Sequence, residues 1–219
     1  MLLAFHQPNY LPNLSYFYKM AQVDIFIVTT NLQFMRREWQ SRAKLKMADK
    51  DLLLTVPVRG SNRQMIREVL IDKSSQWQVK HSKTLESLYH KTAQPEILNS
   101  MLSFYQESYT RLVDLNVALI FFIKDVLNIK TPVIIDEEVG GKKHELLINI
   151  CDKYGADCYL SGVGGKLYMT EDYIAAINKR NIKHRFVEHN VTFEFPYSAI
   201  HYILGESLSK SCDIIKGNI

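Results

Sequence analysis

Apolar positions along the chain follow two spacings, one of short continuous runs and one of helical period. Short apolar runs over 2–5 and 24–28 predict two buried strands. Between them, apolar residues recur every three to four positions over 13–21 and predict a helix. A strand–helix–strand unit of this kind is typical of a nucleotide-binding half of an α/β protein.

The rest of the chain continues this alternation, with a helical stretch in the middle. Further strands are expected over 52–58, 68–71, 133–135, 158–160 and 183–187, and helices over 75–89, 95–106, 109–127, 143–154, 171–179 and 207–215. We therefore expect an α/β fold with a mostly parallel, Rossmann-like sheet flanked by helices and interrupted by a helical insert. We expect one domain over 1–219, with a helical subdomain near 75–128.

Composition and charge are those of an ordinary globular protein. Apolar residues make up 47%, and 27 Lys and Arg against 23 Asp and Glu give a formal charge of +4. This small excess allows an anionic small molecule as a partner without requiring nucleic acid. The apolar runs are shorter than the roughly 20 residues of a membrane span, and the first residues lack the basic lead of a signal peptide. We expect a cytoplasmic protein without membrane insertion.

Polar side chains follow the first predicted strand in a loop that two prolines make rigid. The loop offers four hydrogen-bonding side chains, those of His6, Gln7, Asn9 and Tyr10. Because ligands of doubly wound sheets bind at the carboxyl ends of strands, this loop is a candidate site. The alternative is a turn whose polar groups cap the next helix, with Asn13 as the N-cap.

A basic stretch follows the second predicted strand. Its five cations are Arg36, Arg37, Arg42, Lys44 and Lys46. The planar fork of arginine suits a phosphate or a carboxylate, and Trp39 offers a stacking surface for a base or a sugar. A solvated basic face is the alternative interpretation. RNA binding is a weaker alternative, since a single basic segment supports it.

Two turns that contain glycines precede predicted helices and can expose backbone amides to an anion. The first runs from Gly140 through Lys142 and Lys143. The second contains Ser161, Gly162, Gly164, Gly165, Lys166 and Tyr168. Neither matches a Walker A motif or a Rossmann fingerprint. The alternative for each is an ordinary turn before a helix.

Several motifs occur in an order that resembles the WbqC-like family. They are His-Gln-Pro-Asn-Tyr-Leu-Pro at 6–12, Tyr-Phe-Tyr-Lys at 16–19, Gln-Phe at 33–34, Thr-Val-Pro-Val at 55–58 and Tyr-Leu-Ser-Gly-Val-Gly-Gly at 159–165. The resemblance runs along nearly the whole chain. It implies a role in the biosynthesis of bacterial O-antigen or another surface polysaccharide, and it implies this pathway more firmly than any reaction.

A second, fainter similarity is to pantothenate synthetases, which are adenylate-forming ligases of the nucleotidyltransferase superfamily. Asn-Leu-Gln-Phe at 31–34 looks like their Asn-x-x-Gln-Phe substrate motif, Gly-Lys-Lys-His at 141–144 resembles their Gly-x-Lys-Asp segment, and 161–168 is similar to their phosphate loop. This similarity implies a HUP-type sheet and makes ATP with magnesium a candidate cofactor. Asn13 and Tyr16 stand where that family has two phosphate-gripping histidines.

Together these features favour an enzyme that acylates or aminoacylates the amino group of a nucleotide-linked amino sugar. His6 is expected to act as general base with a pKa near the working pH, while Asn9, Tyr10 and Gln33 orient the substrates. Substrate or phosphate binding is expected of Gln7, Asn31, Arg36, Arg37, Trp39, Arg42, Lys142, Lys143, Ser161, Gly162, Gly164, Gly165, Lys166 and Tyr168. No metal ligand is expected. The alternatives are a non-catalytic module that binds a nucleotide sugar or glycan for a partner transferase, and an RNA- or tRNA-binding protein.

Overall fold

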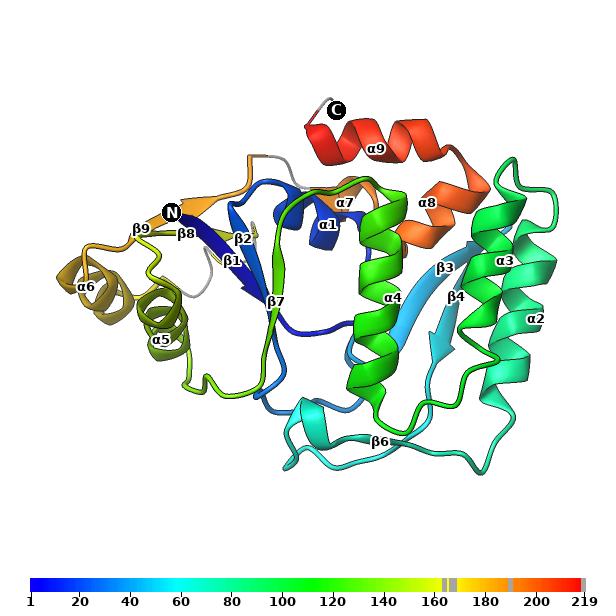
Figure 1. Cartoon of the computed structure of the whole chain (residues 1–219), viewed down its shortest axis with the longest axis horizontal. Coiled ribbons are helices and arrows are strands. Elements are labelled where there is room, and N and C mark those ends of the chain that lie inside the picture. Colours follow the sequence, from blue (N-terminus) through cyan, green and yellow to red (C-terminus); the bar gives the residue numbers. More distant parts are fainter. Residues whose placement is uncertain (163–164, 166–168, 189–190, 218–219) are drawn as a thin grey trace.

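Five parallel strands form the central sheet of the computed structural model, which describes residues 1–162, 165, 169–188 and 191–217 (Figure 1). The strands are β1 (Leu2–His6), β2 (Ile25–Thr29), β7 (Val133–Asp136), β8 (Cys158–Ser161) and β9 (Lys183–Phe186). They lie in the order β7-β2-β1-β8-β9, so the order of connection reverses between β1 and β8. Ligands of such sheets bind outside the carboxyl ends of the strands at this reversal. The expected Rossmann-like α/β fold is confirmed.

Both faces of the sheet are covered, and successive residues of the inner strands serve different faces. In β2, Phe26 packs in the cluster that includes α1 (Leu14–Ala21), whereas Ile27 packs with α5 (His144–Tyr154) and α6 (Glu171–Lys179). Side chains along a strand alternate between faces with a period of two. A strand covered on both faces therefore needs a continuous apolar run, which is the pattern seen in the sequence.

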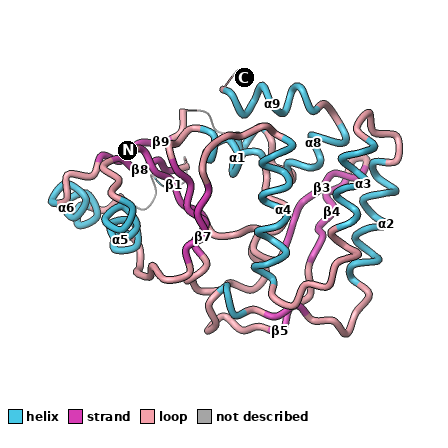
Figure 2. The backbone as a smooth tube through the Cα atoms, in the orientation of Figure 1, coloured by secondary structure: helices cyan, strands magenta, loops and turns pink. Residues whose placement is uncertain are grey.

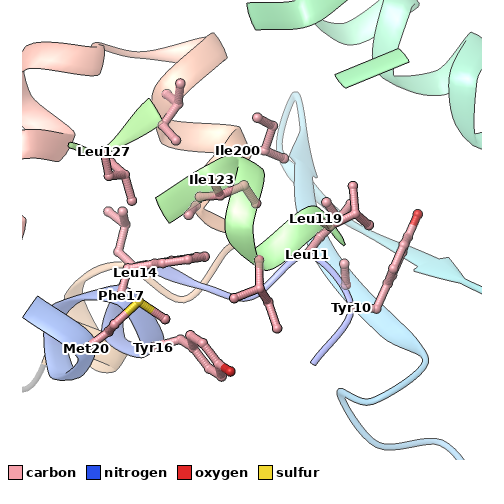
Figure 3. Packing of buried hydrophobic residues seen from close by; sticks show 14 of the residues in the cluster. Tyr10, Leu11, Leu14, Tyr16, Phe17, Met20, Leu119, Ile123, Leu127 and Ile200 are labelled. Atoms are coloured by element: carbon pink, nitrogen blue, oxygen red, sulfur yellow. The ribbon is translucent and has the colours of Figure 1, made fainter. Parts of the chain in front are cut away.

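Helix α1 begins where the sequence predicts. Its N-cap Asn13 accepts a hydrogen bond from the backbone amide of Tyr16, which satisfies one of the free amides of the first turn. Figure 3 shows Leu14 and Phe17 of α1 packed toward Ile123, a residue of helix α4 (Leu112–Val126). All three side chains are fully buried, so this contact fixes α1 against the rest of the core.

The segment between β2 and β7 carries two small antiparallel strand pairs, one 3₁₀ helix and three α-helices. They are β3 (Arg42–Met47), β4 (Lys50–Thr55), β5 (Val58–Arg59), the 3₁₀ helix η1 (Ile66–Glu68), β6 (Leu70–Ile71), α2 (Trp77–Tyr89), α3 (Pro95–Ser103) and α4 (Leu112–Val126). The hairpin β3–β4 lies apart from the main sheet (Figure 2). After β9 come α7 (Val191–Glu194), α8 (Ala199–Gly205) and α9 (Leu208–Lys216). The number of domains stays a prediction. No helix among the described residues is long and apolar enough to cross a membrane.

Two expectations about the hairpin are wrong. A single strand over 52–58 is predicted, but β4 ends at Thr55 and β5 begins at Val58, because Pro57 between them has no amide hydrogen for a ladder. No strand is expected in the basic stretch, yet β3 forms there and pairs with β4. Its alternate residues Ala43 and Leu45 are buried, so the cations of β3 face the other way.

Candidate functional site

Buried hydrogen bonds join the loop after β1 to the segment after β2. The side chain of Gln40 donates from Nε2 to Gln7 Oε1 at 2.8 Å and accepts from the amide of Met35 at 2.8 Å. Asn116 of α4 donates from Nδ2 to the carbonyls of Pro8 at 3.0 Å and of Gln40 at 2.7 Å. Gln40 and Asn116 are both buried from solvent. We call Gln7, Gln40 and Asn116 with these bonds the amide clamp. The amide clamp fixes the two loops relative to each other.

Beside the amide clamp lies a cavity of about 230 Å³, which we call the loop cavity. Its lining includes Asn9, Trp39, Arg42, Pro196 and Ser198, so it lies between the loop after β1, strand β3 and the residues before α8. Three side-chain atoms of these residues are buried without a hydrogen-bond partner among the described residues, namely Asn9 Oδ1, Arg42 Nε and Ser198 Oγ. A buried polar atom left unpaired costs about 1–3 kcal/mol. Three such atoms around one cavity are typical of a site that a ligand completes.

A second hollow, of about 240 Å³, shares Arg42 with the loop cavity. We call it the arginine groove, because Arg36 and Arg37 line it together with Arg42, Ser41 and Thr55. None of its three guanidinium groups forms an ion pair with a carboxylate in the described parts of the chain. Three uncompensated positive charges attract an anion, and the guanidinium fork matches a phosphate or a carboxylate.

Trp39 stands at the loop cavity with half of its surface exposed, at 49%. Its backbone carbonyl accepts a hydrogen bond from the amide of Tyr10 at 2.9 Å, which ties it to the loop after β1. The indole thus keeps an exposed face beside three unpaired polar atoms. An aromatic face next to fixed polar groups is suited to a flat ring such as a base or a sugar.

The basic stretch does not present one solvated face. Lys44 forms an ion pair with Asp51 at 2.7 Å and lies over the ring of Tyr197. Arg42 is partly buried between the loop cavity and the arginine groove, whereas Lys46 is exposed. The cations therefore divide among different contacts, which favours a local anion site over the continuous basic surface that nucleic acid needs.

Tyr10 supports the loop from behind. Its hydroxyl is hydrogen-bonded to the hydroxyl of Tyr105 at 2.6 Å and to Nδ1 of His81 at 2.9 Å, and its side chain is fully buried. Figure 3 shows this hydroxyl on the side of the ring away from the α1 residues. Tyr10 lines the loop cavity, but its hydroxyl is already paired within the protein.

His6 lies at the carboxyl end of β1, where its Nδ1 is 3.0 Å from the carbonyl of Gln7 and its ring meets Tyr16 edge-on. Burial and the nearby positive charge of Lys19 lower the pKa of His6 to about 3. Burial likewise lowers the pKa of Lys19 to about 7, and its Nζ donates to the carbonyl of Phe5 at 3.0 Å. The expected near-neutral pKa of His6 is wrong, because burial and the positive charge of Lys19 both disfavour the protonated ring. The imidazole is neutral at pH 7, and its role as a base stays a prediction.

This environment predicts an acid-dependent loss of stability. The unfolded chain binds a proton at His6 near pH 6.5, whereas the folded chain binds it only near pH 3, so stability from His6 is present above pH 6.5 and is lost as the pH falls. Between pH 7 and pH 5 we expect the native protein to lose about 1–2 kcal/mol more free energy of unfolding than a His6→Gln variant. Urea unfolding of both proteins at the two pH values measures this. Equal losses would show that His6 titrates normally.

Three of the residues expected in the glycine-containing turns come together elsewhere. Lys143, Ser161 and Gly165 line a cavity of about 310 Å³ that also touches Phe5 of β1, and we call it the sheet cavity. Gly162 has open space around its α-carbon. Lys142 is exposed, and its amide donates to the carboxylate of Glu145. The other expected residues, Gly164, Lys166 and Tyr168, lie outside the described residues.

The remaining expected residues form loop contacts. Asn31 donates from Nδ2 to the carbonyl of Glu138 at 2.8 Å, and Gln33 donates from Nε2 to the carbonyl of Asn62. Neither lines the loop cavity or the arginine groove. Gln7 belongs to the amide clamp. The structure thus brings the loop after β1 and the basic stretch together, but only some of the residues expected in the site line the two hollows. The roles assigned to all of them stay predictions.

Three site residues escaped the sequence analysis. Asn116 carries a signal in the sequence, since it is the one polar residue among the buried positions of α4. Gln40 lies among the charged residues of the basic stretch, and nothing in its local sequence indicates that its side chain is buried. Ser198 precedes α8, a helix that the sequence did not predict, and its amide donates to the carbonyl of Lys44 at 2.8 Å. That bond brings the end of the chain to β3.

The residues present do not fit the ATP–magnesium grip that the fainter resemblance implies. The side-chain oxygen of Asn13 caps α1, and Tyr16 is buried against Phe17 and Phe26. The hydroxyl of Tyr16 has no hydrogen-bond partner among the described residues, but it is buried, so a phosphate in solvent does not reach it. Within the described ranges, no group of three or more His, Cys, Asp or Glu residues could hold a metal ion.

Comparison with known proteins gives two matches. The model of the WbqC-like protein family matches residues 7–205. The chain is also similar to a Mycobacterium tuberculosis (strain ATCC 25618 / H37Rv) protein named "Uncharacterized protein Rv1507c". The two are 35% identical over 175 residues, which cover 77% of this chain and 75% of that protein. No solved structure matches.

Proposed function

This chain belongs to the WbqC-like protein family, and from that premise we propose that it acts in surface-polysaccharide biosynthesis by acylating a nucleotide-linked amino sugar. The observation that carries the proposal is the loop cavity, with three unpaired buried polar atoms, joined through Arg42 to the arginine groove. The cavity takes a ring, and the groove takes the charged phosphates beside it. A nucleotide-linked sugar has both parts in one molecule.

The size of the loop cavity limits what it holds. Pockets for whole drug-sized ligands measure about 300–1,000 Å³. At about 230 Å³, the loop cavity suits a single ring, while the rest of the ligand extends into the arginine groove. In this arrangement Arg42 lies between the ring and the phosphates and donates from Nε, its buried unpaired atom.

The proposed reaction forms one bond and breaks one. The nitrogen of the sugar amine attacks the acyl carbon of a donor that arrives already activated, the bond from that carbon to the donor's leaving group breaks, and the amine proton passes to the leaving group or to water. The protein contributes by holding the sugar nucleotide in a fixed position. The amide clamp supports this role, because it removes the freedom of both loops that line the cavity.

A binding and turnover experiment tests the proposal. Uridine, thymidine, cytidine and guanosine diphosphates, free and linked to an amino sugar, are titrated by calorimetry. Each sugar nucleotide is then incubated with acyl thioesters, and mass spectrometry detects the N-acylated product. We expect at least one sugar nucleotide to bind more tightly than its free diphosphate and to gain the mass of one acyl group. Binding without any product would favour the non-catalytic module, and no binding of any nucleotide would refute the proposal.

Trp39 provides a direct report of ring binding. A ligand ring stacked on the indole should change the fluorescence of Trp39, whereas Trp77 is buried and should not respond. The Trp39→Ala variant should bind the tightest-binding of these sugar nucleotides about tenfold more weakly, because stacking of a base on an aromatic ring contributes about 1–3 kcal/mol. Trp39→Phe keeps an aromatic face and should bind with intermediate affinity. An affinity unchanged in Trp39→Ala would show that the ring binds elsewhere.

A further inference from the structure

The sheet cavity lies at the point where the strand order reverses. Its lining includes Phe5 from β1 and Tyr159 and Ser161 from β8, the two strands on either side of the reversal. Helix α5 contributes Leu147, and α6 contributes Tyr173. The cavity of about 310 Å³ therefore lies between the sheet and the two helices that cover its second face, and it is open to solvent. Open α/β sheets hold their ligands at this reversal.

The wall of the sheet cavity is apolar and fixed. The rings of Phe5 and Tyr159 pack with centroids 5.1 Å apart. The hydroxyl of Tyr173 is hydrogen-bonded to Nδ1 of His184 at 3.1 Å, which holds that ring in place. Leu147, Tyr159 and Tyr173 are all buried. Preformed apolar walls of this kind bind hydrocarbon without having to reorganise.

Two polar groups complete the lining. The side chain of Ser161 is more than nine-tenths buried, and Lys143 is exposed at the start of α5. Among the described residues that line the cavity, Lys143 is the one with a charge. Gly165 is required beside them, because a β-carbon there would lie 2.6 Å from the hydroxyl oxygen of Ser161. A glycine at position 165 thus leaves room for the hydroxyl of Ser161 beside the cavity.

We infer that the sheet cavity binds a short apolar acyl group, with its carbonyl or carboxylate oxygen toward Lys143. The inference rests on the proposed function, to which it adds a site for the acyl part of the second substrate. An apolar body matches the walls formed by Phe5, Leu147 and the two tyrosines. One cation and one hydroxyl match a single oxygen-bearing end.

Hexanoate is the probe for this site, with hexan-1-ol and hexylamine as neutral and cationic controls of equal chain length. Their affinities are measured by ligand-observed NMR on the full chain. We expect hexanoate to bind more tightly than hexan-1-ol, and hexylamine to bind most weakly. Leu147→Trp fills the cavity and should remove binding of both hexanoate and hexan-1-ol. Lys143→Met keeps the length of the side chain and should weaken hexanoate about fivefold while leaving hexan-1-ol unchanged.

Lys142→Met is the matched control, since Lys142 is the adjacent exposed lysine and does not line the cavity. If hexanoate does not bind, or if the two lysine variants weaken it equally, the inference is overturned. Should Leu147→Trp fail to fold, the comparison of Lys143→Met with Lys142→Met still tests whether hexanoate binds beside Lys143. Titration of the same variants with the uridine, thymidine, cytidine and guanosine diphosphate-linked amino sugars separates the two proposals. Sugar-nucleotide binding without hexanoate binding removes the acyl site alone, and hexanoate binding without nucleotide binding removes the proposed function.

Discussion

Replacing Arg42 by methionine is expected to weaken binding of the tightest-binding diphosphate-linked amino sugar about a hundredfold. Arg42 lines both the loop cavity and the arginine groove, and its Nε is buried without a partner in the described part of the chain. Hydrogen bonds to charged groups contribute about 1.5–3 kcal/mol, and each 1.4 kcal/mol is a factor of ten in affinity. Removing the guanidinium therefore removes contacts to both the ring and the phosphates. Titration calorimetry of the variant measures the loss.

A control on the same strand separates this role from general charge attraction. Lys46 is an exposed cation of β3 on the same side as Arg42, and it lines neither hollow. We expect Lys46→Met to change the affinity less than twofold, since an exposed charge in salt contributes little. The free energy of unfolding should hardly change in either variant, because methionine retains the apolar stem of the side chain. Equal losses of affinity in both variants would contradict a specific contact at Arg42.

Asn116→Ala is expected to lower the free energy of unfolding by about 3 kcal/mol. Asn116 is fully buried and donates to the carbonyls of Pro8 and Gln40. Alanine would leave two buried carbonyls without a donor, at a cost of about 1–3 kcal/mol each. The same change should loosen the loops on which the loop cavity depends and so weaken sugar-nucleotide binding. Urea unfolding and calorimetry measure the two effects.

Asp125→Ala serves as the control for this measurement. Asp125 is an exposed residue of the same helix, with Lys124 3.7 Å away as its ion-pair partner. Surface substitutions of this kind usually change stability by less than about 0.5 kcal/mol. If Asn116→Ala were no more destabilising than Asp125→Ala, the amide clamp would not hold the two loops together.

The parts of the fold that sequence predicts best are those whose pattern is local. The first strand–helix–strand unit is marked by buried runs and by the N-cap Asn13, and both signals act within a few residues. Strand β3 also carries a local signal, because polar and apolar residues alternate from Arg42 to Met47. Because the stretch is rich in cations, it is interpreted in the sequence by its charge, and the strand is not predicted. The inner strands are apolar without interruption because helices cover the sheet on both faces, so Phe26 and Ile27 of β2 pack in different clusters.

The candidate site was harder to predict, because its parts come from distant segments. Asn9, Trp39 and Arg42 are singled out by residue type, and they do line one cavity. Ser198 lies far along the chain, and only the folding of the C-terminal part brings it to β3. The pKa of His6 depends on Lys19 and on burial, neither of which a motif reports. Local sequence patterns indicate which side chains are candidates for a site. Tertiary packing determines which groups these side chains contact and which protonation state they adopt.

The position of β1 at the centre of the sheet sets the order in which a growing chain can complete its core. One neighbour, β2, follows within about twenty residues, but the other, β8, begins only at Cys158. At synthesis rates of about 5–20 residues per second, one edge of β1 waits roughly 8–30 s for its partner. A pair of strands alone is only marginally stable. The emerging protein therefore carries an open, apolar strand edge through most of its translation.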